Sequence, residues 1–159
     1  MSFQSMLAGL VSAPVSFVVI GGVAGAIHGS ERVTNHLDVV CDASDGATLS
    51  ALAVLLDGWH AYPRGVEKGL PFIMDVRTLR STPVLTLGTS EGDLDLLDRI
   101  DRVGDYRAVL AHSVEVEAFQ VSFRVLDLPT LIKAKRATGR PKDREAILEL
   151  ELLRDLTEE

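Results

Sequence analysis

Short apolar runs, separated by glycine, proline and charged residues, make up most of the chain. Two of these runs, Ser16 to Ile20 and Leu37 to Cys41, predict buried strands because β-branched residues are frequent in them. Four later segments also have the pattern of strands and are expected to pair as two hairpins. They are Val84 to Leu87 with Asp93 to Leu97, and Val114 to Glu117 with Val121 to Val125.

Helices are predicted where apolar residues recur every three or four positions. Ser44 is the expected N-cap of a helix that runs to about Leu56, and Gly139 and Pro141 are expected to end one helix and begin the next. Residues 58–71 are expected to form a loop. The other predicted helices are Gly22 to Gly29, Met74 to Arg80, Asp105 to Ala111, Leu128 to about Thr138 and Pro141 to about Leu156.

This order of elements predicts one α/β (α+β) domain over residues 1–159. A mixed-sheet core is expected at 16–126, followed by a C-terminal helical pair at 128–156. Of the 159 residues, 47% are hydrophobic and 25% are charged, which is typical of a globular protein and argues against a disordered or fibrous chain.

Charge and cysteine content exclude several classes of function. The net charge of −7 argues against a protein that binds nucleic-acid phosphates over its whole surface. The single cysteine, Cys41, excludes an internal disulfide and a zinc site built from several cysteines. The apolar N-terminal stretch lacks a preceding basic residue and is interrupted by Pro14 and Gly21-Gly22, so it does not match a signal peptide or a membrane span. We therefore expect a soluble, cytoplasmic protein without a membrane partner.

A glycine pair follows the first predicted strand. A strand that ends in Gly21-Gly22 and turns into a helix lets the backbone approach a phosphate closely. Tight turns between a strand and a helix also use glycine for steric reasons alone, and the pair by itself favours that interpretation.

Two strands carry side chains that can bind a metal. His36 and Asp38 are two residues apart, as are Asp93 and Asp95, so each pair points to one face of its strand. These four side chains are expected to line one wall beside the glycine turn.

The C-terminal region is locally basic in an otherwise acidic chain. A solvated helix face is the usual meaning of such a run, and a surface for an RNA acceptor would ordinarily add aromatic residues for base stacking. Asp143 lies in the first turn of a predicted helix, where a carboxylate stabilises the helix dipole. The basic residues are Lys133, Lys135, Arg136, Arg140 and Lys142.

Four motifs in order resemble the small bacterial nucleotidyltransferases of the DNA polymerase β-like superfamily. The resemblance extends from about Ser16 to about Leu153. Similar proteins include members of toxin–antitoxin and phage-defence (abortive-infection) systems. The motifs are Gly21-Gly22-x-Ala24 with His28-Gly29, Arg32-x-Thr34 before a D-x-D-like strand, Gly92-x-Leu94-Asp95-Leu96-Leu97, and Leu131-Ile132-x-x-Lys135 with Gly139-Arg140-x-Lys142-Asp143.

The resemblance implies a mixed-sheet nucleotidyltransferase fold and a two-metal transfer of a nucleoside monophosphate from a nucleoside triphosphate to a hydroxyl. Mg²⁺, or Mn²⁺ in its place, would be the cofactor. Asp38 and Asp95 match the metal-binding carboxylates, with Asp93 as a substitute for Asp95. Gly21 and Gly22 match the turn that faces phosphate, and Arg140 and Lys142 are expected to contact phosphate. The resemblance makes a partner protein or a tRNA plausible as acceptor.

His36 departs from the family pattern because it stands where the family has its first aspartate. Magnesium prefers oxygen ligands, and a neutral imidazole brings no negative charge. Three hypotheses follow: a nucleotidyltransferase with weakened metal binding, a degenerate fold that binds a nucleotide or a partner without turnover, or a site in which His36 recruits manganese or zinc.

Overall fold

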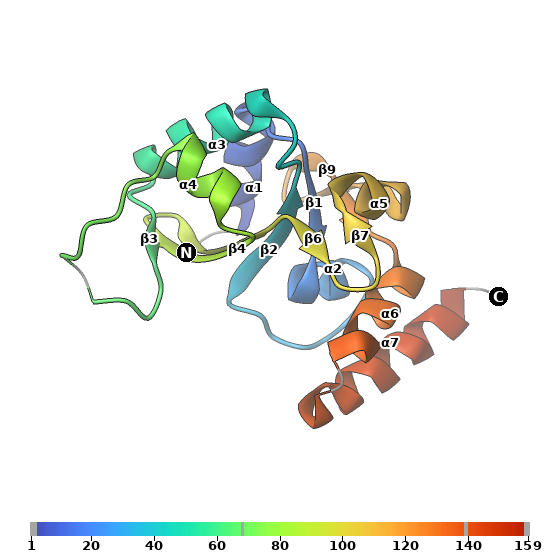
Figure 1. The fold of residues 1–159 in the computed structure, drawn as a ribbon. Coiled ribbons are helices and arrows are strands. Elements are labelled where there is room, and N and C mark those ends of the chain that lie inside the picture. The colour runs from blue at the N-terminus through green and yellow to red at the C-terminus, as the bar shows by residue number, and fades with distance from the viewer. Residues whose placement is uncertain (1–2, 68, 139, 158–159) are drawn as a thin grey trace.

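A mixed sheet forms the centre of the molecule, which the computed structural model describes over residues 3–67, 69–138 and 140–157. Its strands are β1 (Phe17–Ile20), β2 (His36–Cys41), β3 (Tyr62–Pro63), β4 (Val84–Thr89), β5 (Gly92–Leu97), β8 (Ser113–Ala118) and β9 (Val121–Leu126). They lie in the order β3-β4-β5-β2-β1-β9-β8 (Figure 1). A separate small hairpin consists of β6 (Arg99–Ile100) and β7 (Gly104–Asp105).

The central strands combine parallel and antiparallel pairing. β1 pairs antiparallel with β2 and parallel with β9, and β2 pairs parallel with β5. In this register Asp38 lies between Ile20 on one side and Asp95 on the other. Residues opposite each other in a sheet point to the same face, so the pairing brings the two carboxylates together.

Helices cover the sheet and extend from it. They are α1 (Phe3–Ser12), α2 (Gly21–Ile27), α3 (Gly46–Gly58), α4 (Val76–Ser81), α5 (Tyr106–Ala111), α6 (Leu128–Thr138) and α7 (Arg144–Thr157). In Figure 1, α1, α3 and α4 are grouped together at one side of the sheet, and α6 and α7 lie as a pair at the other. The predicted mixed α+β fold with a C-terminal helical pair is confirmed.

Aspartates cap the start of several helices, α3, α4, α5 and α6 among them. The carboxylate of Asp45 accepts a hydrogen bond from the backbone N–H of Ala47, so Asp45 and not Ser44 is the N-cap of α3. The Ser44 hydroxyl instead donates to Asp42. Asp75 and Asp105 cap α4 and α5 in the same way. Each cap satisfies backbone donors that the first helical turn leaves unpaired.

Three further details differ from the sequence-based expectations. The segment expected as a loop over residues 58–71 contains the short strand β3, and the hairpin of β6 and β7 has too few residues to produce a recognisable pattern. The last predicted helix begins with a turn of 3₁₀ helix at Pro141–Asp143 before α7. The expected helix stop at Gly139 lies outside the described residues.

Helix α1 was not among the predicted elements, although Phe3, Met6, Leu7 and Leu10 recur at the i, i+3, i+4, i+7 spacing of an amphipathic helix. Met6, Leu7 and Leu10 are fully buried in it. Gly9 lies directly against the indole ring of Trp59, at the end of α3. The absence of a side chain at Gly9 therefore allows α1 and α3 to pack closely.

One connected group of buried residues extends from Met6 in α1 to Leu150 in α7. It consists mainly of valine and leucine, and strands β1 and β2 supply its centre. Within the described part of the chain, no helix is long and apolar enough to cross a membrane.

We expect Gly9→Ala to lower the free energy of unfolding by about 1–3 kcal/mol, because its Cβ would enter the ring of Trp59. Alanine normally stabilises a helix interior relative to glycine by about 0.5–1 kcal/mol, so the expected sign is the reverse of the helix propensity. The measurement is the midpoint of urea unfolding. Gly58→Ala is the control, since nothing lies within 4 Å of a Cβ at that position. A Gly9→Ala variant as stable as the wild type would contradict the close packing of α1 and α3.

Candidate functional site

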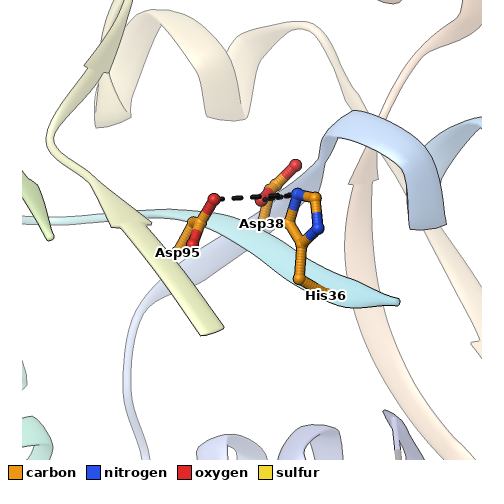
Figure 2. Close-up of side chains that lie close together, drawn as sticks. All are labelled: His36, Asp38 and Asp95. Atoms are coloured by element: carbon orange, nitrogen blue, oxygen red, sulfur yellow. Dashed lines mark ion pairs between the residues drawn. The ribbon is translucent and has the colours of Figure 1, made fainter. Parts of the chain in front are cut away.

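Three side chains converge on the face of β2 and β5 beside the start of α2. The Nε2 atom of His36 lies 3.2 Å from Oδ1 of Asp38 and 3.7 Å from Oδ2 of Asp95 (Figure 2). One ligand atom from each of the three residues lies within 4.8 Å of the others. All three side chains are partly exposed, so a small ligand can reach them.

The two glycines after β1 are required by the side chains around them. Gly21 has a φ of +66°, and a Cβ at this position would collide with the carboxylate of Asp38. A Cβ at Gly22 would lie only 2.8 Å from Oγ1 of Thr34. The glycine turn therefore lets Asp38 fit against the backbone at the start of α2, which supports the steric explanation of the pair.

Asp38 is in an unfavourable electrostatic position. Burial, together with the negative charge and the hydrogen bond of Asp95, raises the pKa of Asp38 from 3.8 to about 7, while Arg64 and Lys135 act in the opposite direction. Its Oδ1 atom is buried and has no hydrogen-bond partner among the described residues. A cation between Asp38 and Asp95 would relieve both the repulsion and the missing interaction.

Arg64 is the nearest cation to this pair of carboxylates, and sequence analysis did not single it out. Its Nη2 atom donates to Oδ1 of Asp95 at 2.6 Å, and its Nη1 atom donates to the carbonyl oxygen of Leu87 at 2.8 Å. The residue follows β3, inside the segment that we expected to be a loop. No motif indicated it, because its position depends on the pairing of β3 with β4.

An open cleft of about 900 Å³ extends from the glycine turn to α6, α7 and the 3₁₀ turn between them. Asp38, Asp95 and His36 line it at one end, and Lys135 and Arg140 line it at the other. The cleft is large enough for a ligand the size of a nucleotide.

Arg140 and Asp143 form part of the far wall of this cleft. The Nε atom of Arg140 donates to Oδ2 of Asp143 at 3.0 Å, and 55% of the Arg140 side chain is exposed. Arg140 is thus within the cleft that holds the carboxylates, although it does not touch them. The side chain of Lys142 lies outside the described residues.

Asp143 is buried, and it does more than stabilise the dipole of the helix whose first turn it was expected to occupy. It accepts hydrogen bonds from Thr138 and Arg140, and Lys135 lies 3.8 Å away. Burial alone would raise the pKa of Asp143, but the Thr138 hydroxyl and the two cations outweigh it and hold the pKa below its usual value. These contacts connect the end of α6 to the start of α7 and position Lys135 and Arg140 along the cleft.

The structure brings together three of the four metal-binding candidates. Asp93 lies opposite His36 in the register, but it is not part of the close group of ligand atoms. His28 lies at the end of α2, where a nitrogen of its ring contacts the carbonyl oxygen of Leu126 at 2.7 Å. Lys135 was noted as part of a basic run and of a family motif, and its proximity to Asp38 depends on the docking of α6.

The group formed by His36, Asp38 and Asp95 fits one divalent cation. Two carboxylates supply hard oxygen ligands, and the imidazole adds a nitrogen that transition metals accept more readily than magnesium does. A bound cation would also give an interaction to Oδ1 of Asp38, which is buried and accepts no hydrogen bond from the described residues.

Comparison with solved structures finds this fold in a crystal structure from Thermotoga maritima, described as that of a "putative nucleotidyltransferase". The two chains are 17% identical, the match covers 94% of each chain, and the TM-score is 0.55. No protein-family model matches the sequence, and no curated protein matches it significantly. At this identity the likeness establishes the fold, which agrees with the sequence-based resemblance: the chain has a nucleotidyltransferase-like α+β fold with a candidate metal site.

Proposed function

We propose that this protein transfers a nucleoside monophosphate from a nucleoside triphosphate to a hydroxyl acceptor, using a divalent cation. The observation that carries the proposal is the convergence of His36, Asp38 and Asp95 at the glycine turn. The cleft beside them and the fold shared with the Thermotoga maritima structure support it.

In this reaction the acceptor oxygen forms a bond to the α-phosphorus, the bond between the α- and β-phosphates breaks, and pyrophosphate leaves with the negative charge. The acceptor hydroxyl releases its proton to solvent water. A bound divalent cation supplies charge stabilisation at the reacting phosphate. The chain contributes the carboxylates that bind this cation and the cleft that orients the two substrates.

Phosphate binding is proposed along the cleft. Gly21 and Gly22 are proposed to face phosphate through their backbone N–H groups, because Asp38 and Thr34 fill the space beside their Cα atoms. Lys135 and Arg140 are cations of the C-terminal region that line the same cleft, and Lys142 is proposed with them. Arg140 lines the cleft with 55% of its side chain exposed, and Asp143 holds its Nε atom at 3.0 Å, so the rest of the guanidinium is proposed to face a ligand. The acceptor class remains a proposal, with a partner protein or a tRNA in the cytoplasm as the candidates implied by the toxin–antitoxin and phage-defence resemblance.

The identity of the metal follows from the donor set. Mg²⁺ is the cation implied by the resemblance, but an imidazole ligand favours Mn²⁺ over Mg²⁺. We therefore propose Mn²⁺ as the better cofactor for this chain and Mg²⁺ as the weaker one.

One observation favours a second candidate function, that of a fold that binds a nucleotide or a partner without turnover. His36 replaces a negatively charged ligand, and Arg64 already contacts Asp95 at 2.6 Å. Both features reduce the negative charge available to a metal. The His36→Asp experiment described below distinguishes the two functions.

We expect Asp38→Asn and Asp95→Asn each to weaken Mn²⁺ binding by about a hundredfold or more, because each change removes a charged ligand. Asp38→Asn should also raise the midpoint of thermal unfolding without metal, since it removes a buried charge beside Asp95. Titration calorimetry and thermal unfolding are the measurements. Asp93→Asn is the matched control: it makes the same change two residues from Asp95, and it should bind Mn²⁺ as the wild type does. Equal weakening in all three variants would contradict the proposed ligand set.

We expect label from one of the four α-³²P-labelled nucleoside triphosphates to appear on a macromolecule or small molecule of a cell extract when Mn²⁺ is present. Transfer should disappear in Asp95→Asn and persist in Asp93→Asn. The measurement is gel electrophoresis and thin-layer chromatography of the products. Absence of transfer with Mn²⁺ and Mg²⁺ alike, in a protein that binds the metal, would favour the binding function over the enzyme.

We expect His36→Asp to raise the affinity for Mg²⁺ at least tenfold, because a third carboxylate adds a charged oxygen ligand. In a weakened enzyme the same change increases transfer with Mg²⁺. His36→Asn serves as the control, since it removes the imidazole without adding charge. If His36→Asp gains Mg²⁺ affinity but no transfer, the protein is a binding module, and if it gains neither, the proposed metal position is wrong.

A further inference from the structure

Arg64 is held by the sheet in a position from which it reaches the metal-binding carboxylates. The pairing of Tyr62 with Gly88 and Pro63 with Leu87 continues for one more residue, where the backbone N–H of Arg64 donates to the carbonyl of Thr86 at 2.8 Å. Thr86 is in turn opposite Asp95, and Asp95 is opposite Asp38.

These four residues form one row across four adjacent strands or their extensions. Opposite residues in a sheet project to the same face, so Arg64 points to the face that carries Asp95 and Asp38. Thr86 lies between Arg64 and Asp95 in this row. Because Thr86 is small, the long side chain of Arg64 extends past it to Asp95. Its second nitrogen is fixed to the carbonyl of Leu87, so the guanidinium is anchored at two points and its position at Asp95 is well defined.

The carboxylate oxygens of the site are thereby divided between different partners. Oδ1 of Asp95 accepts from Arg64 at 2.6 Å. Oδ2 of Asp38 faces Gly21, where an added Cβ would contact it. The two remaining oxygens, Oδ1 of Asp38 and Oδ2 of Asp95, both face Nε2 of His36, at 3.2 and 3.7 Å. Three ligand atoms, one from each residue, thus surround a single point, and Oδ2 of Asp38 lies to the side of it, against Gly21.

A pair of metal ions about 3.5–4 Å apart needs carboxylates that bridge them, and a bridging carboxylate uses both of its oxygens. The hydrogen bond from Arg64 makes Oδ1 of Asp95 a poor ligand for a second ion. The charges lead to the same result: the two carboxylates and the guanidinium that contacts them leave a net charge of −1, which one divalent cation changes to +1 and two would change to +3, and Lys135 near Asp38 makes the site more positive still. The second ion would bind against a substantial repulsion.

We propose that Arg64 is a built-in positive charge that takes the place of a second metal ion, so that the protein alone binds one divalent cation per chain. The inference rests on the proposed metal site and departs from the two-metal arrangement that the family resemblance implies. Arg64 then acts through Asp95 as a positioning residue.

A purely structural role for Arg64 is the alternative, because its bond to Leu87 also fixes the segment after β3 to β4. The two roles differ in what they predict for metal binding. Loss of a structural contact lowers stability and leaves the number of bound ions unchanged, whereas loss of a resident positive charge raises the affinity for cations.

The experiment is a titration of the full chain with Mn²⁺ alone, followed by electron paramagnetic resonance of the free ion, for the wild type, Arg64→Ala, Arg64→Lys and Arg80→Ala. The wild type should bind one ion. Arg64→Ala should bind the first ion about tenfold more tightly or better and should accept a second. Arg64→Lys retains the charge and should remain at one ion with an affinity close to that of the wild type. Arg80→Ala, an exposed arginine on α4 outside the cleft, should match the wild type.

Two ions in the wild type, or an Arg64→Ala variant that binds Mn²⁺ no more tightly than the wild type, would overturn the inference while leaving the metal site in place. Binding in none of the proteins would overturn the proposed metal site and the inference with it. Thermal unfolding of each variant without metal identifies a variant that has failed to fold, in which case Arg64→Gln, which keeps a hydrogen-bond donor without the charge, replaces Arg64→Ala under the same criteria.

Discussion

The pairing of Asp38 with Asp95 across two parallel central strands is the constraint on which the rest of the site depends. Two neighbouring carboxylates that are both mostly buried are unfavourable without positive charge nearby. Two residues supply this positive charge: Arg64 donates a hydrogen bond to Asp95, and Lys135 lies near Asp38. Gly21 leaves room for the Asp38 carboxylate. The same arrangement prepares the site for a cation. The two neighbouring carboxylates therefore lower the stability of the unliganded protein and raise its affinity for a metal. Such a trade-off is common where charged groups are concentrated for function.

Local patterns in the sequence were sufficient for the strands and for the metal-binding candidates. The spacing of His36 and Asp38 placed both on one face of a strand, and the buried apolar neighbours determined which face. The position of Arg64 beside Asp95 could not be predicted from the sequence. It depends on the register of β3, a strand of only two residues in a segment that contains several glycines and prolines. Helix α1 is a different case: Phe3, Met6, Leu7 and Leu10 recur at helical spacing, so the local pattern was present although the helix was not predicted. Only the failure at Arg64 concerns a contact between segments that are distant in sequence.

The nucleotidyltransferase-like fold and the chemistry of this particular site carry separate information. A fold shared at 17% identity leaves the ligands of the site free to differ. In this chain a histidine and an arginine lie beside the carboxylates, and each reduces the negative charge that a pair of magnesium ions would require. The cleft, the glycine turn and the basic residues of α6 and the 3₁₀ turn are compatible with either a catalytic or a binding role. Transfer activity in the presence of a bound metal is thus the property that separates the two functions.

The strand order also has a consequence for how the protein folds. The pairs Asp38–Asp95 and Val19–Val125 join residues that are far apart in the chain, and β1 receives its parallel partner β9 only after most of the sequence has been synthesised. Such non-local pairing raises the contact order and slows folding, because loop-closure entropy is lost before the contacts form. During translation, β1 and β2 can pair early as an antiparallel unit, but β1 remains an unprotected edge until residue 126 leaves the ribosome. The nascent chain is therefore exposed to aggregation during that interval, and the metal-binding side chains meet only after β5 has joined the sheet.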